Sequence, residues 1–239
     1  MKFIFFINPI NLINLINPTM LSAKLHSLNF RIQTFISRWG KRVMELAAHS
    51  RKGQVLSGWW WFEWIVRFGE LGGLFLVYET LLDWIKWNTR PLTKEEWKLA
   101  EPYFGKNIRL DQVRLDTLSF VGTRQKQFAY VSFYTINFWK ELKPSVLIHE
   151  LVHIWHYEQL GAAYLVRALR GQWSREGYDY GGVEAIRGKS FLDFNLEQQA
   201  EIVMDFYRLQ HGIKTVWGKA KWQDTEVYIQ ILSPHFAFA

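Results

Sequence analysis

A segment near the middle of the chain carries three histidines and a glutamate whose spacing suits metal chemistry. Residues 147–161 read LIHELVHIWHYEQLG, in which His149, Glu150 and His153 form an H-E-x-x-H motif. Two imidazoles four residues apart project from one helical face, about 6 Å apart along the axis. Zinc takes imidazole nitrogens at about 2.0–2.1 Å, and a glutamate beside the first ligand can accept a proton from water. The motif therefore predicts two metal ligands, His149 and His153, and a general base, Glu150.

Packing is the alternative explanation for these histidines. A lone histidine on the core side of a helix is better explained by a hydrogen bond to a carbonyl group. Two histidines at ligand spacing, with the glutamate in place, favour metal binding instead. His156 lies seven residues after His149, about 10.5 Å along the axis, which is too far to share one ion. We expect His156 to line the pocket. Because an extended metzincin motif requires glycine at this position, that class is excluded.

A catalytic zinc site usually has three protein ligands, so a third must come from elsewhere in the chain. The chain has no cysteine, which leaves histidine and carboxylates as donors. Glu201 and Asp205 share a face of a later predicted helix, one turn apart. We predict that Glu201 binds zinc and that Asp205 accepts a hydrogen bond from the far nitrogen of a ligating histidine. Glu197, one turn earlier, is the alternative ligand. A further alternative is that these acids are solvated and that Asp205 pairs with Arg208.

Helix-start and helix-stop residues delimit the two helices that would carry the site. Pro144 predicts the start of the motif helix and Gly161 its end. Asn195 predicts the N-cap of the later helix, and Gly212 closes it. The segment between them, residues 173–190, is rich in glycine and tyrosine and reads as a long loop.

A small sheet is expected before the motif helix. Residues 108–115 (IRLDQVRL) and 127–133 (QFAYVSF) show the alternation typical of short strands, with a turn around Gly122 between them. Thr93 and Glu96 form a capping box that predicts another helix upstream. We therefore predict an α+β fold, mostly α. It contains a zincin-like domain with a small antiparallel sheet, a motif helix and a ligand helix.

Composition divides the 239-residue chain into three regions. Residues 1–20 repeat Ile, Asn, Leu and Pro, and we expect a disordered or weakly signal-like segment. Residues 21–88 read as amphipathic, Trp-rich helices, and residues 89–239 as the zincin-like metallopeptidase domain. The longest uncharged stretch of the second region, residues 71–78, is far shorter than the roughly 20 residues of a membrane span.

The Trp-rich segment 55–87 has two interpretations. We expect a buried helical hairpin that packs on the zincin-like domain. Peripheral membrane contact is the alternative, because tryptophan beside basic residues suits the headgroup level of a bilayer. The formal charge of +7 favours anionic surfaces, but the basic residues are scattered, so no nucleic acid partner is expected. We expect a cytoplasmic location before any specialised secretion, with peripheral membrane attachment as the alternative.

Several segments resemble an uncharacterised bacterial family of predicted zinc metallopeptidases. The segments are RPLTKEEWKLAEPYFGKNIRLDQVRL, LIHELVHIWHYEQ, YDY and FNLEQQAEIVMDFY, within residues 89–211. Proteins of this family carry a helical motif like HELTHVWQ, and related domains occur in toxins and in contractile injection or type VI spike systems. His156 stands where that motif has glutamine. The arrangement is also similar to that of gluzincins, whose H-E-x-x-H is completed by a downstream E-x-x-x-D, here Glu201 and Asp205. The resemblance implies a zinc peptidase with a secretion-system or toxin partner.

Two functions are consistent with these patterns. The first is a zinc-dependent peptidase acting on a peptide or protein substrate, in which His149, His153 and Glu201 hold the metal and Glu150 activates water. The second is a non-catalytic, metal-stabilised accessory or binding protein of a secretion or toxin system. Substrate access distinguishes them, because a cleft filled by residues 21–88 or by the tail would not admit a peptide. A third interpretation, a peripheral membrane protein in which the motif is ordinary core, predicts no stoichiometric zinc.

Overall fold

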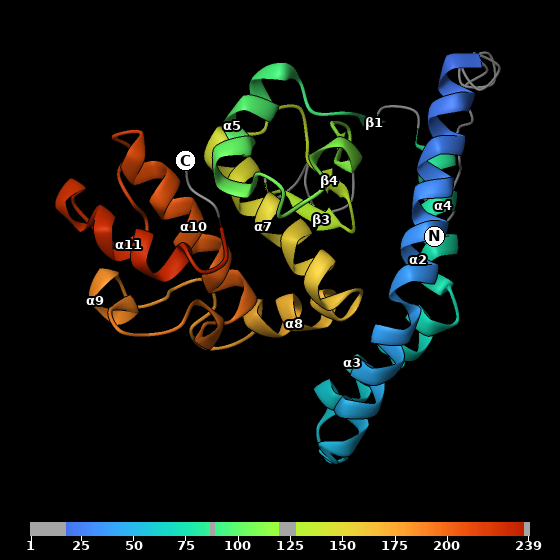
Figure 1. The fold of residues 1–239 in the computed structure, drawn as a ribbon. Coiled ribbons are helices and arrows are strands. Elements are labelled where there is room, and N and C mark those ends of the chain that lie inside the picture. Colours follow the sequence, from blue (N-terminus) through green and yellow to red (C-terminus); the bar gives the residue numbers. More distant parts are fainter. Residues whose placement is uncertain (1–17, 87–88, 120–127, 237–239) are drawn as a thin grey trace, which may run out of the picture.

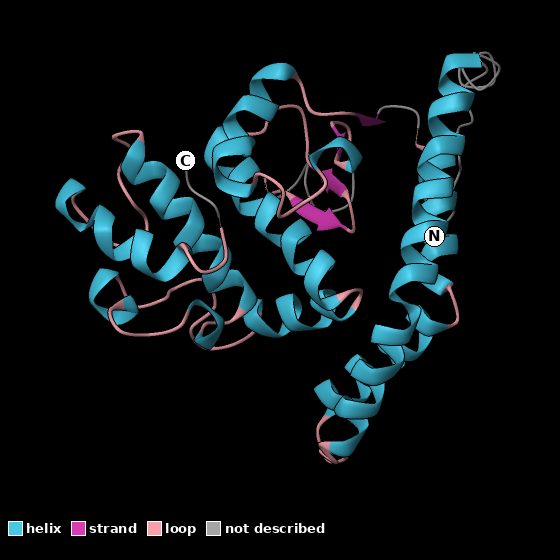
Figure 2. Cartoon of the chain, in the orientation of Figure 1, coloured by secondary structure: helices cyan, strands magenta, loops and turns pink. Residues whose placement is uncertain are grey.

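Helices make up most of the chain and surround one small sheet (Figures 1 and 2). The computed structural model describes residues 18–86, 89–119 and 128–236. The predicted α+β class, mostly α, is therefore confirmed. The predictions made for residues 1–17 and for the turn around Gly122 lie outside the described residues.

Three N-terminal helices form a layer along one side of the molecule (Figure 1). They are α2 (Pro18–Arg51), α3 (Gly58–Leu71) and α4 (Leu74–Ile85). Ser57 caps α3 by accepting a hydrogen bond from the backbone N–H of Trp60. No helix among the described residues combines the length and apolarity that crossing a membrane requires. We call these three helices the helical layer.

Helices α3 and α4 run back along α2 one after the other, so they do not form the expected buried hairpin with each other. At one end Trp60 donates its indole N–H to the carbonyl oxygen of His49, at 3.1 Å. At the other end Arg31 pairs with Asp83 at 3.0 Å. These contacts fix the antiparallel register of the layer. Helix α4 contains no buried residue, which contradicts the expected burial.

The described strands form one four-stranded sheet in the order β1-β2-β4-β3. Strand β2 pairs in parallel with β4, while its pairing with β1 and the pairing of β3 with β4 are antiparallel. The sheet is therefore mixed, not antiparallel as predicted. Alternation in the sequence indicates a strand but not the direction of its neighbour, and residues 117–134 supply the longer connection that a parallel pair needs. The strands are β1 (Thr89–Arg90), β2 (Arg114–Asp116), β3 (Tyr130–Ser132) and β4 (Thr135–Asn137).

The other helices pack around this sheet and against one another. Each predicted cap among them is present. Thr93 and Glu96 form the capping box of α5, Asn195 caps α10, and Gly161, with φ of 63°, follows α7. The helices are α5 (Lys94–Phe104), α7 (Pro144–Leu160), α8 (Ala163–Gln172), α9 (Val183–Ile186), α10 (Leu196–Gln210) and α11 (Thr225–Leu232), with short 3-10 turns at Leu110–Gln112, Phe191–Asp193 and Trp222–Asp224.

Helices α7 and α10 lie side by side in the core. The ten consecutive residues 147–156 of α7 are all buried, so this helix is covered on every side. Ile148 and Ile154 of α7 and Ile202 and Phe206 of α10 are fully buried. The predicted loop at residues 173–190 is interrupted only by the short α9. The tail packs on α10 through α11. The motif is therefore held by a rigid, close-packed pair of helices.

Candidate metal centre

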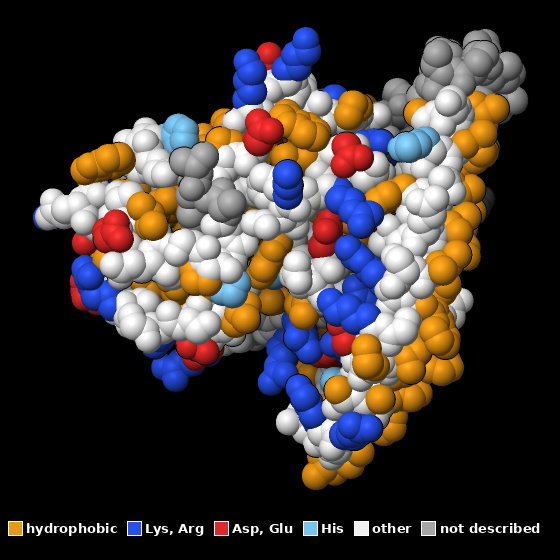
Figure 3. Space-filling model, in the orientation of Figure 1, with side chains coloured by type: hydrophobic (Ala, Val, Ile, Leu, Met, Phe, Trp, Pro, Cys, Tyr) orange, Lys and Arg blue, Asp and Glu red, His pale blue; other side chains and the backbone are white. Residues whose placement is uncertain are grey.

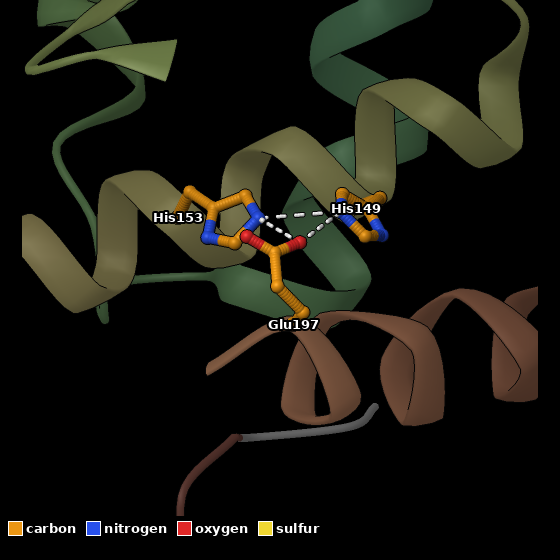
Figure 4. Close-up of side chains that lie close together, drawn as sticks. All are labelled: His149, His153 and Glu197. Carbon is orange, nitrogen blue, oxygen red and sulfur yellow. Dashed lines mark hydrogen bonds and ion pairs between the residues drawn. The ribbon is translucent and has the colours of Figure 1, made fainter. Parts of the chain in front are cut away.

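Two histidines and one glutamate converge where α7 crosses the first turn of α10 (Figure 4). The Nε2 atoms of His149 and His153 are 3.2 Å apart. Glu197 Oε2 lies 3.5 Å from His149 Nε2 and 3.4 Å from His153 Nε2. All three residues are buried, each with at most 7% of its surface exposed. One carboxylate oxygen and two imidazole nitrogens thus form a nearly equilateral triangle.

This triangle has the dimensions of three ligands around one small cation. Tetrahedral ligands at about 2.0–2.1 Å from zinc are roughly 3.3–3.4 Å from one another. The three observed separations, 3.2, 3.4 and 3.5 Å, agree closely with that value. Glu197 Oε2 is also buried without any hydrogen-bond partner among the described residues, although its other oxygen accepts a bond from Gln172. Since a buried carboxylate oxygen normally needs a partner, the donor set fits a divalent cation.

The structure brings Glu197, not Glu201, to the two Nε2 atoms. Glu201 lies on the other side of the His149 ring, with Oε1 3.3 Å from Nδ1. A carboxylate in that position orients a ligating imidazole and leaves the lone pair of Nε2 for the metal. The geometry therefore favours the alternative ligand, Glu197. It gives Glu201 the supporting role that the sequence assigned to Asp205.

Asp205 stabilises the fold instead of contacting a histidine. Its carboxylate accepts hydrogen bonds from Tyr180 Oη (2.9 Å) and from the backbone N–H groups of Val216, Trp217 and Gly218 (2.7–2.9 Å). The residue is completely buried. It therefore fastens the segment after α10 to that helix. The predicted bond from a ligating histidine is absent among these contacts, because Asp205 lies one further turn from the motif. Arg208 pairs with Asp205 at 3.0 Å, which confirms that part of the alternative, but the acids of α10 are buried and not solvated.

His156 contacts Nδ1 of His153 and does not line the cavity at the metal triangle, so its role differs from the expected pocket lining. The side-chain Nε2 of Gln199 donates to the carbonyl oxygen of Phe194 at 2.7 Å, so Gln199 Oε1 is free to accept. His156 Nε2 lies 2.9 Å from that oxygen and must carry the proton. The Nδ1 of His156, 3.4 Å from Nδ1 of His153, is then an acceptor. This chain of bonds places the His153 proton on Nδ1 and leaves Nε2 unprotonated for a metal.

Burial and charge act in opposite directions on the ionisable groups of the site. Burial lowers the pKa of His149, but Glu197 and Glu201 raise it more, to about 10. Burial raises the pKa of Glu197, yet the charges of His153 and His149 hold it well below its usual value. Burial, with the nearby His153, lowers the pKa of His156 to about 3, so His156 stays neutral. The acids thus favour a positive charge between the two helices, as a cation would supply.

Glu150 lies beside the metal triangle and is 4% exposed. Its Oε2 is buried without a hydrogen-bond partner among the described residues. Burial is the largest cause that raises its pKa above the usual value, which makes this carboxylate a stronger proton acceptor. The catalytic role predicted from the motif is therefore compatible with its surroundings.

A cavity of about 840 Å³ opens onto the site. Both motif histidines, Glu150, Glu197 and Glu201 line it, and so does Tyr178, whose ring lies 6.2 Å from that of His149. Burial raises the pKa of Tyr178, so its hydroxyl stays protonated and can donate a hydrogen bond. No residue of the helical layer or of the described tail lines this cavity. Among the described residues, therefore, neither region fills the cleft over the metal triangle.

Two comparisons with known proteins each gave a match. Over an alignment of 133 positions, which covers 49% of this chain and 13% of the matched protein, the sequence is 30% identical to the type VI secretion system spike protein VgrG2b of Pseudomonas aeruginosa. Among solved structures, the effector domain of Pseudomonas aeruginosa VgrG2b matches with 23% identity and a TM-score of 0.42, over 60% of this chain and 83% of that domain. No family model matches the chain.

Proposed function

We propose that this chain is a zinc-dependent peptidase in which His149, His153 and Glu197 hold the metal. The observation that carries the proposal is the triangle of donor atoms, with edges of 3.2–3.5 Å, buried beside an accessible cavity. Imidazole and carboxylate donors suit zinc, and three protein ligands leave a fourth position for water or substrate. Glu201 and the pair of His156 and Gln199 orient the two imidazoles.

The residues of the site can perform peptide hydrolysis in a defined sequence. A bound zinc ion supplies a Lewis acid and lowers the pKa of a coordinated water towards 7. Glu150 takes the proton from the attacking water and delivers it to the amide nitrogen as the C–N bond breaks. Tyr178, still protonated, can donate a hydrogen bond to the carbonyl oxygen as negative charge develops there.

Two features of the cavity favour a peptide as substrate. Strand β3 lies at the edge of the sheet, and residues 129–131 line the cavity. An edge strand offers backbone groups to which an extended peptide can add as a further strand. The remaining lining includes aromatic and aliphatic side chains that can receive apolar substrate residues: Phe128, Tyr164, Leu165, Leu169 and Met204.

The similarity to a spike protein supports a secretion-system partner for this chain. We infer that the chain works as an effector or toxin domain delivered by, or assembled with, such a system. The alternative, a non-catalytic accessory module stabilised by metal, is less favoured because the cavity is open and Glu150 is placed where a structural metal site would not need it.

The decisive experiment separates metal binding from hydrolysis. Glu150→Gln should keep one zinc per chain, measured by mass spectrometry of the purified protein. Its hydrolysis of fluorescein-labelled casein or of a mixed peptide library should fall at least about 100-fold. Glu176→Gln, an exposed glutamate on a nearby loop, is the matched control and should leave both properties unchanged. Full hydrolysis by Glu150→Gln, or the absence of zinc from the parent chain, would refute the proposal.

A further inference from the structure

The helical layer has an inverted distribution of polar and apolar side chains. Within residues 21–85, the exposed charged residues are Lys41, Arg51 and Lys52, and none of the acidic residues is exposed. Apart from Gly58, every exposed residue of α3 and α4 is hydrophobic or aromatic. Figure 3 shows hydrophobic side chains gathered along the outer side of the layer, with lysine and arginine on the side towards the rest of the molecule. We call the exposed apolar side chains of α2, α3 and α4 the outer face.

Charged residues hold the helices of the layer to one another and join the layer to α8. Glu63 of α3 is 8% exposed and accepts hydrogen bonds from Arg67 of the same helix and from Arg167 of α8, both at 2.8 Å. Arg42 of α2 pairs with Glu70 of α3 at 3.2 Å. Ion pairs, which normally lie at a protein surface, are therefore buried between the layer and the rest of the molecule. The apolar residues of the layer are left on its outer side. Of the exposed apolar residues of α3 and α4, Tyr78 also contacts the rest of the described chain, with its ring centroid 5.9 Å from that of Phe133.

The outer face is large and continuous. Helix α2 contains 34 residues, which corresponds to a length of about 51 Å, and α3 and α4 return along it. On α3 and α4 the side chains of Ile65, Phe68 and Leu81 are 56–60% exposed. Soluble monomeric proteins rarely expose continuous apolar patches larger than a few hundred Å², and larger ones mark interaction sites. The outer face is of this larger kind.

The turn between α2 and α3 adds basic residues to one end of this face. Arg51 and Lys52 are exposed there, followed by the half-exposed Val55 and the fully exposed Leu56. Trp61 donates its indole N–H to the carbonyl oxygen of Val55 at 2.9 Å, which holds the turn beside the start of α3. We call residues 51–56 the basic turn. Cationic side chains next to protruding apolar ones suit the boundary between anionic headgroups and acyl chains.

We propose that the outer face and the basic turn dock on the surface of an anionic lipid bilayer. Three observations favour a bilayer over a protein partner. The exposed charges of the layer are all basic, the apolar surface extends the length of three helices, and tryptophan and tyrosine are among its exposed residues. Aromatic residues and cations at the interface are the features of in-plane membrane helices. The layer lies flat on the membrane and presents the zincin-like domain on its other side.

Vesicle binding by the full chain tests this proposal without any measurement of peptidase activity. We expect the parent to co-sediment with vesicles of equal parts phosphatidylglycerol and phosphatidylcholine. The triple variant Ile65→Ser, Phe68→Ser and Leu81→Ser should bind at least tenfold more weakly. The matched control, Leu192→Ser, Ile213→Ser and Trp222→Ser, removes side chains of similar exposure (48–68%) from the zincin-like domain and should bind like the parent.

The basic turn has a test of its own. The double variant Arg51→Gln and Lys52→Gln should weaken binding to the anionic vesicles about tenfold, since each basic residue near such a surface contributes. Its binding to pure phosphatidylcholine should equal that of the parent.

Three results would overturn the proposal. They are no vesicle binding by the parent, equal binding by the outer-face triple variant, and a dimer in sedimentation equilibrium without lipid that the triple variant dissociates. The last result would show that a second copy covers the outer face.

Discussion

Both the helical layer and the metal centre bury charged residues, but their charges are satisfied differently. In the layer, Arg67 bonds to Glu63 at 2.8 Å and to Glu45 at 3.2 Å, and Arg167 adds bonds to Glu63. In the metal centre the acids of α10 face imidazoles instead: Glu197 Oε2 lies 3.4 Å from His153 Nε2, and Glu201 Oε1 lies 3.3 Å from His149 Nδ1. Guanidinium groups keep their protons and cannot bind a cation, whereas neutral imidazoles and carboxylates are metal ligands. The charges of the layer therefore form a structural junction, and the cluster between α7 and α10 is the candidate site for an ion.

The largest expected effect on stability comes from removing one charge from the ion pairs of the helical layer. Arg67→Met keeps the aliphatic volume but removes the charge that faces the buried Glu63 and the partly exposed Glu45, so the free energy of unfolding should fall by about 3 kcal/mol. Ile65→Ser, two residues earlier and 60% exposed, should change it by less than about 0.5 kcal/mol. Urea unfolding followed by circular dichroism measures both. Equal losses in the two variants would contradict the inverted polarity of the layer.

A smaller effect, on zinc affinity, is expected from changes to His156, the neutral residue that contacts His153. His156→Phe removes the acceptor that fixes the His153 proton, so zinc affinity should fall about 10- to 100-fold. His156→Gln offers a carbonyl oxygen to the same N–H and should restore most of this loss. Competition with a fluorescent zinc chelator measures the affinities. Unchanged affinity in His156→Phe would mean that the bond chain through Gln199 has no part in orienting His153.

The smallest expected effect concerns a single acid in the layer. Burial is the largest cause that raises the pKa of Glu79, to about 8, from a value of 4.5. Because the folded protein binds this proton more tightly than the unfolded chain, Glu79 costs stability as the pH rises from about 4.5 through 8. Glu79→Gln should therefore raise the melting temperature at pH 8.5 by roughly 2–4 °C, about 1 kcal/mol, and have little effect at pH 4.5. A variant less stable than the parent at pH 8.5 would contradict this.

Local signals in the sequence predicted the elements that carry the site. The caps at Thr93 and Asn195 and the glycine at 161 act through neighbouring backbone groups, so short-range chemistry alone determines them. Whether Glu197 or Glu201 reaches the Nε2 atoms of the two histidines depends on the position of α10 along the axis of α7. That register is set by packing between the buried side chains of the two helices, which no local pattern contains.

Two further features also lay beyond sequence reasoning. Periodicity showed that residues 21–88 have an apolar and a polar face, but not which face is turned inward. The usual assumption, apolar inside, holds only in part. Trp60 and Val66 of α3 are buried and Phe75 of α4 packs against the core. Glu63 and Arg67 of α3 are buried as well, because they form ion pairs. The parallel pairing of β2 with β4 was missed because strand direction depends on the connection between strands. The supporting role of His156, by contrast, can be inferred from the sequence, because a third histidine on the motif helix can hydrogen-bond to a ligating one.

Zinc affinity of two glutamine variants, compared by isothermal titration calorimetry, tests the central claim most directly. Glu197→Gln removes a ligand charge and should weaken binding by more than about 100-fold, whereas Glu201→Gln keeps an oxygen for His149 Nδ1 and should weaken it about tenfold or less. The reverse order would show that Glu201 completes the site. Failure of the parent chain to bind zinc at all would contradict the metal centre itself.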